Sequence, residues 1–419
     1  MGRQVSIGLY SPFFGSTVGG GEKYLAVAAE ALHEGFPDAR VEIVSPIPAD
    51  RELYERMLSV DLAGIGLVST SVKVAPWQRS LNRMRWLRLY RDLFVSARAV
   101  RFTSRYDVFL SMVYVMPAFT RAAHSAILCQ FPYEVGPVTK RLPAPLKPVY
   151  WLYTLPNRML RPILVGDDLS HFEAIVCQSD YVRSWVKRYW QRDAELVFPP
   201  IDVPAAEPDY GAKEPIILSV GRFFVGGHSK RHDVMVDAFR RLCDQGLTDW
   251  ELHLAGAVHR DGPNGDYFKR VQQAAKGYPV HIHPDAGYDE VQDLYRRSSI
   301  YWHASGYGVD PDRRPIDIEH FGMTVVEAMS HGSVPVVLAQ GGPLEVVGKG
   351  VEGLHWLQMP ELAEETLGLI RDPDRRRRLA RAARLASLRY TRQEFKRRMV
   401  ERIRPLVLAA RQDLGLRPR

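Results

Sequence analysis

The sequence predicts an α/β protein with two doubly wound parallel sheets, each in a domain of its own. Short apolar runs that resemble strands alternate with helical patterns along the whole chain. The runs form two sets, and a polar, proline-rich segment at residues 202–215 separates them. This strand–helix alternation is typical of parallel sheets covered by helices on both faces. The length of 419 residues suits two or three domains.

The predicted strands of the first set cover residues 5–10, 41–44, 108–112, 126–131, 174–177 and 196–198. Those of the second set cover residues 216–220, 252–255, 280–283, 300–303, 334–338 and 353–356. Near the end, Thr391 and Glu394 form a capping-box pattern that predicts a last helix. We therefore expect domains at 1–203 and 204–390, followed by a helix over 391–419. Open α/β sheets bind ligands at the carboxyl ends of their strands, which predicts an active site in the cleft between the domains.

Composition indicates a soluble globular protein, with 46% hydrophobic and 25% charged residues. The N-terminus shows no apolar core typical of a signal peptide. The longest apolar run, residues 108–119, is interrupted by Ser111 and Pro117 and is shorter than the roughly 18–20 residues that a membrane span needs. The three cysteines have no CxxC spacing, so we expect them reduced and buried in a cytoplasmic protein. No metal-ligand spacing is seen among the 13 histidines, and we expect no bound metal.

The net charge of +8 is unevenly distributed, and two segments carry much of it. Arg79, Arg83, Arg85, Arg88 and Arg91 fall in a segment whose apolar positions fit one helical face. Such a helix can lie on an anionic membrane surface at the inner face of the membrane, or it can dock on its own domain. The second segment, residues 140–153, mixes prolines, bases and aromatics. It predicts an irregular lid or acceptor loop, with a structural connector as the alternative.

The segment around Glu319 and Glu327, IEHFGMTVVEAMSHGSVPVV, is the most informative for function. It predicts a helix over residues 324–331, with Gly332 as its stop and an apolar strand after it. Free N–H groups at the start of this helix, together with the helix dipole, form a site for a phosphate. The two carboxylates can accept hydrogen bonds from hydroxyls on either side of that phosphate, as in a nucleotide sugar. Alone, two glutamates at this spacing are typical of an ordinary helix with an acidic first turn.

Motifs along most of the chain strengthen the functional interpretation. The glutamate segment resembles the E-x7-E signature of retaining GT-B glycosyltransferases of family 4. SVGRFF at 219–224, followed by Lys230 and DVMVDAF at 233–239, is similar to that family's VGR…KG.D.li.AF pattern. Further similar segments, in matching order, are VGGGEK at 18–23, IVCQSDY at 175–181, VFPPID at 197–202 and LHLAG at 252–256.

The resemblance implies a GT-B fold, with two Rossmann-like domains facing a central cleft and a final helix that crosses back to the first domain. It implies retaining transfer of a hexose-type sugar from a UDP- or GDP-linked donor, without a cofactor. The acceptor would be a glycan, a lipid-linked molecule or a small molecule in glycoconjugate biosynthesis. Nothing in the sequence resembles a nucleic-acid-binding motif.

Transfer from a nucleoside diphosphate builds negative charge on the leaving group, and fixed positive groups must be directed at it. Arg222 follows a strand and a glycine, and its guanidinium can hold two phosphate oxygens. Lys230 is the natural second cation, although about three inserted residues separate it from the arginine compared with the family pattern. Arg231 and His232 are therefore rival candidates for this role. By itself, Arg222 would also fit a surface ion pair.

The resemblance assigns further roles to residues of the motifs. Glu319 would hold hydroxyls of the transferred sugar and Glu327 those of the ribose, and the loop 306–311 would cover the donor. The other predicted donor-binding residues are Gly20, Gly21, Gly221, Gly256, Tyr288, Phe321, Gly322, Met323 and Thr324. Tyr288 belongs to a segment, 285–288, that would contact the nucleobase.

One departure from the family pattern concerns the strand at 126–131. Many relatives carry a histidine that faces the sugar, and Gln130 stands in its place here. Glutamine can hydrogen-bond the sugar but cannot titrate, which favours positioning over acid–base chemistry at this point. The alternatives to a transferase are a GT-B sugar-nucleotide epimerase and a non-catalytic basic binding protein.

Overall fold

The computed structural model describes residues 3–70, 88–115, 118–134, 144–165 and 169–416. The chain divides into two compact units, which are described separately. Unit 1 comprises residues 1–178, 182–200 and 395–419, and unit 2 comprises 179–181 and 201–394. Most of the basic segment at residues 79–91, including Arg79, Arg83 and Arg85, lies outside the described residues. Among the described residues, we find no helix with the length and apolar character to span a bilayer.

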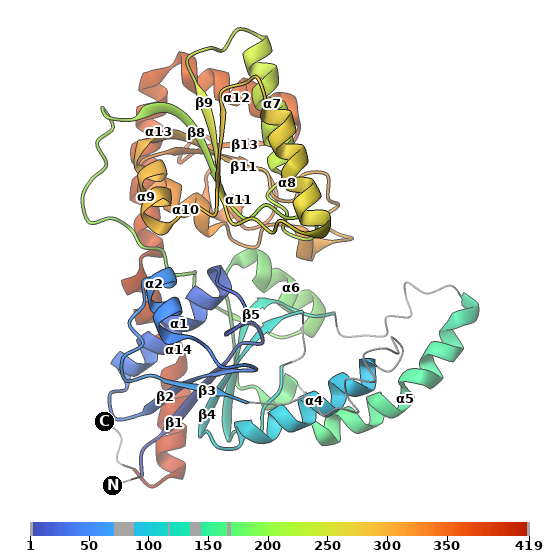
Figure 1. Ribbon diagram of the computed structural model, residues 1–419. Coiled ribbons are helices and arrows are strands. Elements are labelled where there is room, and N and C mark those ends of the chain that lie inside the picture. The colour runs from blue at the N-terminus through green and yellow to red at the C-terminus, as the bar shows by residue number, and fades with distance from the viewer. Residues whose placement is uncertain (1–2, 71–87, 116–117, 135–143, 166–168, 417–419) are drawn as a thin grey trace. The chain divides into compact units, whose positions relative to one another are not determined.

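Unit 1 contains a seven-stranded sheet in the order β3-β2-β1-β4-β5-β6-β7 (Figure 1). Its strands are β1 (Ser6–Tyr10), β2 (Arg40–Ser45), β3 (Gly66–Ser69), β4 (Val108–Tyr114), β5 (His124–Phe131), β6 (Ala174–Cys177) and β7 (Glu195–Leu196). Every pair of neighbouring strands is parallel. The helices with most of their residues in this unit are α1 (Gly20–Gly35), α2 (Arg51–Leu58), α4 (Arg88–Thr103), α5 (Lys147–Leu164), α6 (Asp180–Trp190) and α14 (Arg392–Asp413).

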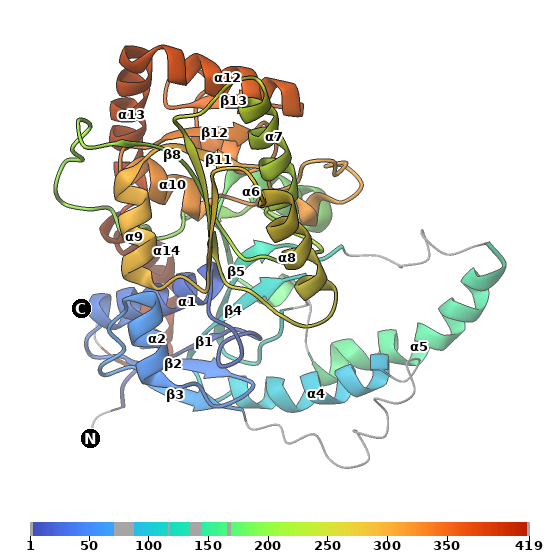
Figure 2. The ribbon, with the colours of Figure 1, turned by 45° about the horizontal axis from the view of Figure 1, so that its top comes forward.

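Unit 2 contains a six-stranded parallel sheet in the order β10-β9-β8-β11-β12-β13. Its strands are β8 (Glu214–Val220), β9 (Glu251–Gly256), β10 (Val280–Pro284), β11 (Ser298–His303), β12 (Val334–Leu338) and β13 (Leu354–Trp356). Its helices are α7 (His232–Asp244), α8 (Gly262–Ala275), α9 (Tyr288–Arg297), α10 (Met323–Ser330), α11 (Pro343–Val346), α12 (Met359–Arg371) and α13 (Pro373–Ser387). Helices pack on both faces of this sheet, as Figure 2 shows.

The two predicted sheets are confirmed, with strand ends that differ by a few residues. The prediction missed β3, a four-residue edge strand of sequence GLVS. Two of its residues are glycine and serine and it has no fully buried side chain, so its apolar signal is weak. Two other predictions need correction. The segment 140–153 is helical from Lys147 onward rather than an irregular lid, and Cys243 is only half-buried, whereas Cys129 and Cys177 are buried.

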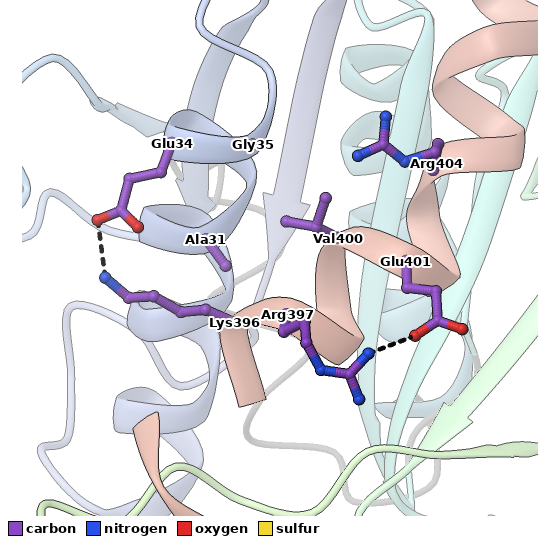
Figure 3. A pocket seen from close by; sticks show the side chains of 8 residues that line it. All are labelled: Ala31, Glu34, Gly35, Lys396, Arg397, Val400, Glu401 and Arg404. Carbon is purple, nitrogen blue, oxygen red and sulfur yellow. Dashed lines mark hydrogen bonds and ion pairs between the residues drawn. The ribbon is translucent and has the colours of Figure 1, made fainter. Parts of the chain in front are cut away.

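Helix α14 packs against α1 in unit 1 (Figure 3). Its side chains Phe395, Met399 and Ile403 belong to the same buried core as the strands of this unit. A Cβ atom on Gly35 would lie 2.6 Å from the Val400 side chain, so only glycine permits this close approach. Lys396 of α14 adds an ion pair to α1, with its Nζ 2.7 Å from Glu34 Oε1.

Candidate functional site

The candidate site of unit 2 lies where the strand order of its sheet reverses. Strand β8 has β9 on one side and β11 on the other, so loops after β8 and β11 lead away on opposite faces. Open α/β sheets bind ligands at such a reversal, outside the carboxyl ends of the strands. Gly221 and Arg222 directly follow β8, and His303 ends β11.

Glu319 is the centre of a charged cluster at this point. Lys230 Nζ donates a hydrogen bond to Glu319 Oε2, and His303 Nε2 lies 3.7 Å from the same oxygen. Burial alone would raise the pKa of Glu319, but Lys230 and His303 hold it well below its usual range. Burial lowers the pKa of His303, which therefore stays neutral near pH 7. An ammonium has three donors, so Lys230 can hold Glu319 and still offer donors to an anion.

Two glycines make room for the lysine. A Cβ atom on Gly221 would lie 2.4 Å from Lys230 Cγ, so the side chain of Lys230 passes directly over Gly221. Gly256 has φ +157°, and a Cβ atom there would lie 2.0 Å from the carbonyl oxygen of Gly221. Backbone packing at the ends of β8 and β9 thus requires glycine at position 256, and the side chain of Lys230 occupies the space beside Gly221.

The loop with the insertion, residues 223–229, folds toward the same cluster. Asp317 would clash with a Cβ atom on Gly227, at 2.3 Å, so the loop and the segment before Glu319 are in close contact. His228 has a left-handed backbone with φ +61°. Its ring lies 4.5 Å from that of His320, edge to face. Burial lowers the pKa of His228, with Glu319 and Lys230 among the charges around it.

The two rivals of Lys230 point elsewhere. The guanidinium of Arg231 donates to both oxygens of Asp233 at 3.1 Å and to the carbonyl of Tyr307. His232 is fully buried and stacks on Phe223, with ring centroids 4.0 Å apart. Among these three neighbours, the structure therefore brings only Lys230 to Glu319.

Helix α10 begins at Met323, one residue earlier than predicted, and ends at Ser330. Gly322 caps it with φ +97°, and its carbonyl accepts the first helical bonds, from Val325 and Val326. Met323 and Thr324 belong to the first turn of the helix, and the N–H groups of a first turn have no acceptor within the helix. Before the helix start, Gly342 N donates to the carbonyl oxygen of Glu319 at 2.9 Å. This hydrogen bond holds the backbone that leads into α10.

Glu327 lies one turn into α10 and is held by a tyrosine. The hydroxyl of the buried Tyr295 donates to Glu327 Oε2 at 2.9 Å. Burial, with Glu327 next, raises the pKa of Tyr295 well above its usual value, so the hydroxyl stays protonated and remains the donor. In the same way Tyr301 donates to Thr324 Oγ1 at 2.8 Å. Glu327 is therefore oriented by Tyr295, which the motif does not include, whereas Glu319 is held by Lys230 of the motif, with His303 beside it.

Three further predicted regions lie in the same unit. Arg222 is exposed, and its guanidinium lies 5.5 Å from the centre of the Phe224 ring. Tyr288 begins α9 and is 44% exposed. Near Tyr288, the carboxylate of Asp285 accepts a hydrogen bond from Val258 N at 2.8 Å and pairs with Arg260. These contacts hold the loop that follows β9. In the loop 306–311, the ring of Tyr307 lies 5.3 Å from that of Trp356.

The remaining predicted residues belong to unit 1. Gly20 and Gly21 form the first turn of α1, and a Cβ atom on Gly21 would meet no atom within 4 Å. Gln130 lies near the end of β5 and is 9% exposed. Its Nε2 has no hydrogen-bond partner in the part of the chain that the structure describes, although Gln178 donates to its carbonyl at 3.0 Å.

Several site residues were missed in the sequence. His303 is the last residue of β11. A polar residue at the carboxyl end of a buried strand often lies at a ligand site, and this position could have indicated His303 in the sequence. The pairing of β9 with β10 brings Glu251, His253 and His281 together, with ligand atoms within 4.8 Å of one another, contrary to the expectation that no such group exists. Their mutual contacts include His253 Nε2 to Glu251 Oε2 at 3.0 Å. The parallel register places His281 opposite His253, which the sequence alone does not reveal.

Removing the ring nitrogens of His232 is expected to make unit 2 less sensitive to acid. Burial lowers the pKa of His232 to about 3, whereas an unfolded histidine has a pKa of about 6.5. Between these values only the unfolded chain binds the proton, so stability falls as pH falls, by about 1.4 kcal/mol per pH unit. His232→Phe keeps the stacking on Phe223 and removes this loss. Thermal unfolding at neutral and at mildly acidic pH should show a smaller drop in Tm for the variant, and an equal drop would contradict the assignment.

Comparison with known proteins identifies the site region. Residues 205–386 match the family model described as Glycosyl transferases group 1. This range includes Arg222, Lys230, Glu319 and Glu327, and unit 2 thus carries a domain of that family.

Individual proteins resemble longer parts of the chain. The sequence is 20% identical over 454 aligned residues to "GDP-Man:Man(3)GlcNAc(2)-PP-Dol alpha-1,2-mannosyltransferase" of Dictyostelium discoideum, covering 96% of this chain and 85% of that protein. The protein of the same name from Neurospora crassa is 28% identical over 230 residues, 51% of this chain and 38% of its own length. The crystal structure of Anabaena HepE in complex with UDP and glucose superposes with a TM-score of 0.63 and 15% identity, covering 96% of this chain and all of that one. The two Rossmann-like sheets and this likeness show the GT-B fold.

Proposed function

We propose that this chain, whose residues 205–386 carry a Glycosyl transferases group 1 domain, is a retaining glycosyltransferase that uses a nucleoside-diphosphate hexose. The observation that carries the proposal is the pairing of Lys230 with Glu319, at the reversal point of the sheet and directly before α10. A cation, a carboxylate and a helix start in this order suit a diphosphate with a sugar hydroxyl beside it.

The proposed donor is GDP-mannose, with UDP-linked hexoses as the alternatives. The curated relatives named above are mannosyltransferases whose names specify GDP-Man. Glu327, oriented by Tyr295, would hold the ribose hydroxyls, and the first amides of α10 would contact the phosphate. Glu319 would accept from hydroxyls of the transferred sugar, as the glycosyltransferase resemblance implies.

In the proposed reaction the bond between C1 of the sugar and the diphosphate oxygen breaks while an acceptor oxygen bonds to C1 on the same face. The acceptor proton passes to the leaving diphosphate, so no residue is needed as a separate base. Arg222 and Lys230 would stabilise the charge that builds on the diphosphate. Gln130, whose Nε2 has no partner among the described residues, would hydrogen-bond the sugar, and the Gly20–Gly21 turn would adjoin the diphosphate and the acceptor.

The proposed acceptor is a glycan or a lipid-linked molecule, and the proposed location is cytoplasmic, at the inner face of a membrane. The Dictyostelium relative is named for a dolichol-linked glycan acceptor, which supports a lipid-linked acceptor here. A lipid-linked acceptor requires peripheral contact with the bilayer.

Donor turnover tests the proposal. The chain should release GDP from GDP-mannose faster when a lipid-linked glycan acceptor is added, and the product should keep the anomeric configuration of the donor. Since the proposed cations are Arg222 and Lys230, activity should survive EDTA. An epimerase would change the sugar without any acceptor, and a binding protein would do neither. Loss of activity in EDTA with recovery in Mg²⁺ would show that a metal carries part of the charge.

A further inference from the structure

Helix α5, Lys147–Leu164, has an apolar stripe on its solvent side. We define the outer stripe by the exposed side chains Val149, Leu152, Met159, Leu160 and Ile163. Leu152 is 65% exposed and Ile163 72% exposed. Spacings of three, four and seven residues place these side chains on one helical face. A soluble helix normally presents charged residues on the face that this helix fills with leucine, isoleucine and methionine.

The opposite face of α5 is already packed. The rings of Tyr153 and Tyr90, the latter in α4, lie 5.7 Å apart, and Asn157 Nδ2 donates to the carbonyl of Leu89 at 3.2 Å. Near the end of the helix, Arg121 Nη2 donates to the carbonyls of Ile163 and Leu164 at 3.3 Å. Figures 1 and 2 both show α4 and α5 side by side. The outer stripe is therefore a second apolar face, separate from the one that holds α5 to unit 1.

The charged side chains of α5 itself are all basic: Lys147, Arg158 and Arg161. From residue 135 to residue 166 the sequence contains no aspartate or glutamate. Lys147 and Arg158 are exposed on α5, and Trp151 beside them is 49% exposed. An apolar face, with bases and an indole on the other exposed side of the same helix, matches a helix that lies between acyl chains and anionic headgroups.

We propose that the outer stripe of α5 docks on an anionic phospholipid bilayer, with the helix axis in the plane of the interface. The apolar side chains would enter the acyl boundary, and Lys147 and Arg158 would lie near lipid phosphates. The biological role of this docking rests on the proposed function, because docking would bring unit 1 to a membrane that holds a lipid-linked acceptor. The sequence predicted membrane contact through the basic segment at residues 79–91, whereas this proposal assigns the contact to the outer stripe of α5.

Vesicle flotation of the full chain tests this docking without any measurement of activity. The chain should float with vesicles of phosphatidylcholine and phosphatidylglycerol at low salt, and high salt or pure phosphatidylcholine should weaken binding, by about fivefold for each base that contacts lipid. Leu152→Glu combined with Ile163→Glu should weaken binding by at least about tenfold, because two charges would enter the acyl boundary. Both side chains are exposed, so the variant should keep the Tm of the parent protein.

Leu385 provides the matched control, since it is also 65% exposed but lies on α13 of unit 2. Leu385→Glu should bind vesicles like the parent protein. Brominated lipid should quench tryptophan fluorescence, and Trp151→Phe should remove part of this quenching. Equal binding by the parent and the double-glutamate variant would overturn the proposal. Absence of vesicle binding by the parent protein would also overturn it. If the parent protein then formed a dimer that the double substitution dissociates, the occupant of the stripe would be a second copy of the chain. A failure of the donor assay alone would leave vesicle binding unchanged.

Discussion

Lys230→Met is expected to lower kcat by about 10²–10³-fold, the loss typical of removing one donor aimed at developing charge. Methionine keeps most of the side-chain length that packs over Gly221. The substitution removes the ammonium that would face the leaving diphosphate. It also leaves the carboxylate of Glu319 without its hydrogen bond from Nζ. Steady-state kinetics with saturating donor would measure the effect.

The pH dependence separates the two consequences of this substitution. Burial raises the pKa of Glu319 and Lys230 lowers it, so loss of the lysine should move this pKa upward. The remaining activity should then rise with pH as the carboxylate ionises. Arg231→Met is the matched control, because Arg231 contacts Asp233 and Tyr307 instead of the cluster. If Lys230→Met kept the parent kcat, or if Arg231→Met lost as much, Lys230 would not be the cation of the site.

The sequence was sufficient for the sheets because their strands are continuous apolar runs. Val334–Leu338, for instance, is buried throughout, and its predicted and observed ends coincide. The helix after Glu319 was also predicted to within one residue at each end, and Gly322 caps its start with a left-handed backbone. Local conformation and the hydrophobic pattern determine these features.

The partners of the motif residues could not be predicted, because they come from distant parts of the chain. His303 and Tyr295 reach Glu319 and Glu327 through the parallel pairing of β11 and the packing of α9. The choice between Lys230 and its neighbours depends on where the backbone turns, and Arg231 turns with φ +56°. The outer stripe of α5 was hidden for another reason: apolar residues in a sequence are assigned to a core by default.

The last expectation concerns the different effects of Glu319→Ala and Glu327→Ala. Glu319 would contact the transferred sugar, which changes shape in the transition state, whereas Glu327 would hold the ribose, whose contacts stay constant. Interactions that strengthen in the transition state affect kcat, and uniform ones affect KM. Glu319→Ala should therefore mainly lower kcat. Glu327→Ala should mainly raise the KM for the donor, with a loss of roughly 1–3 kcal/mol for the unpaired polar partner.

Binding of the free nucleoside diphosphate, measured by calorimetry, distinguishes the two glutamates, because this ligand has a ribose and no transferred sugar. Glu327→Ala should weaken its binding and Glu319→Ala should leave it nearly unchanged. Tyr295→Phe is the matched control for Glu327, since it removes only the hydroxyl that donates to Glu327 Oε2 at 2.9 Å. With the carboxylate present but less well oriented, its effect on diphosphate affinity should have the same sign as that of Glu327→Ala and be smaller. Loss of diphosphate binding in Glu319→Ala, with normal binding in Glu327→Ala, would reverse the assignment, because the glutamate before α10 would then hold the ribose.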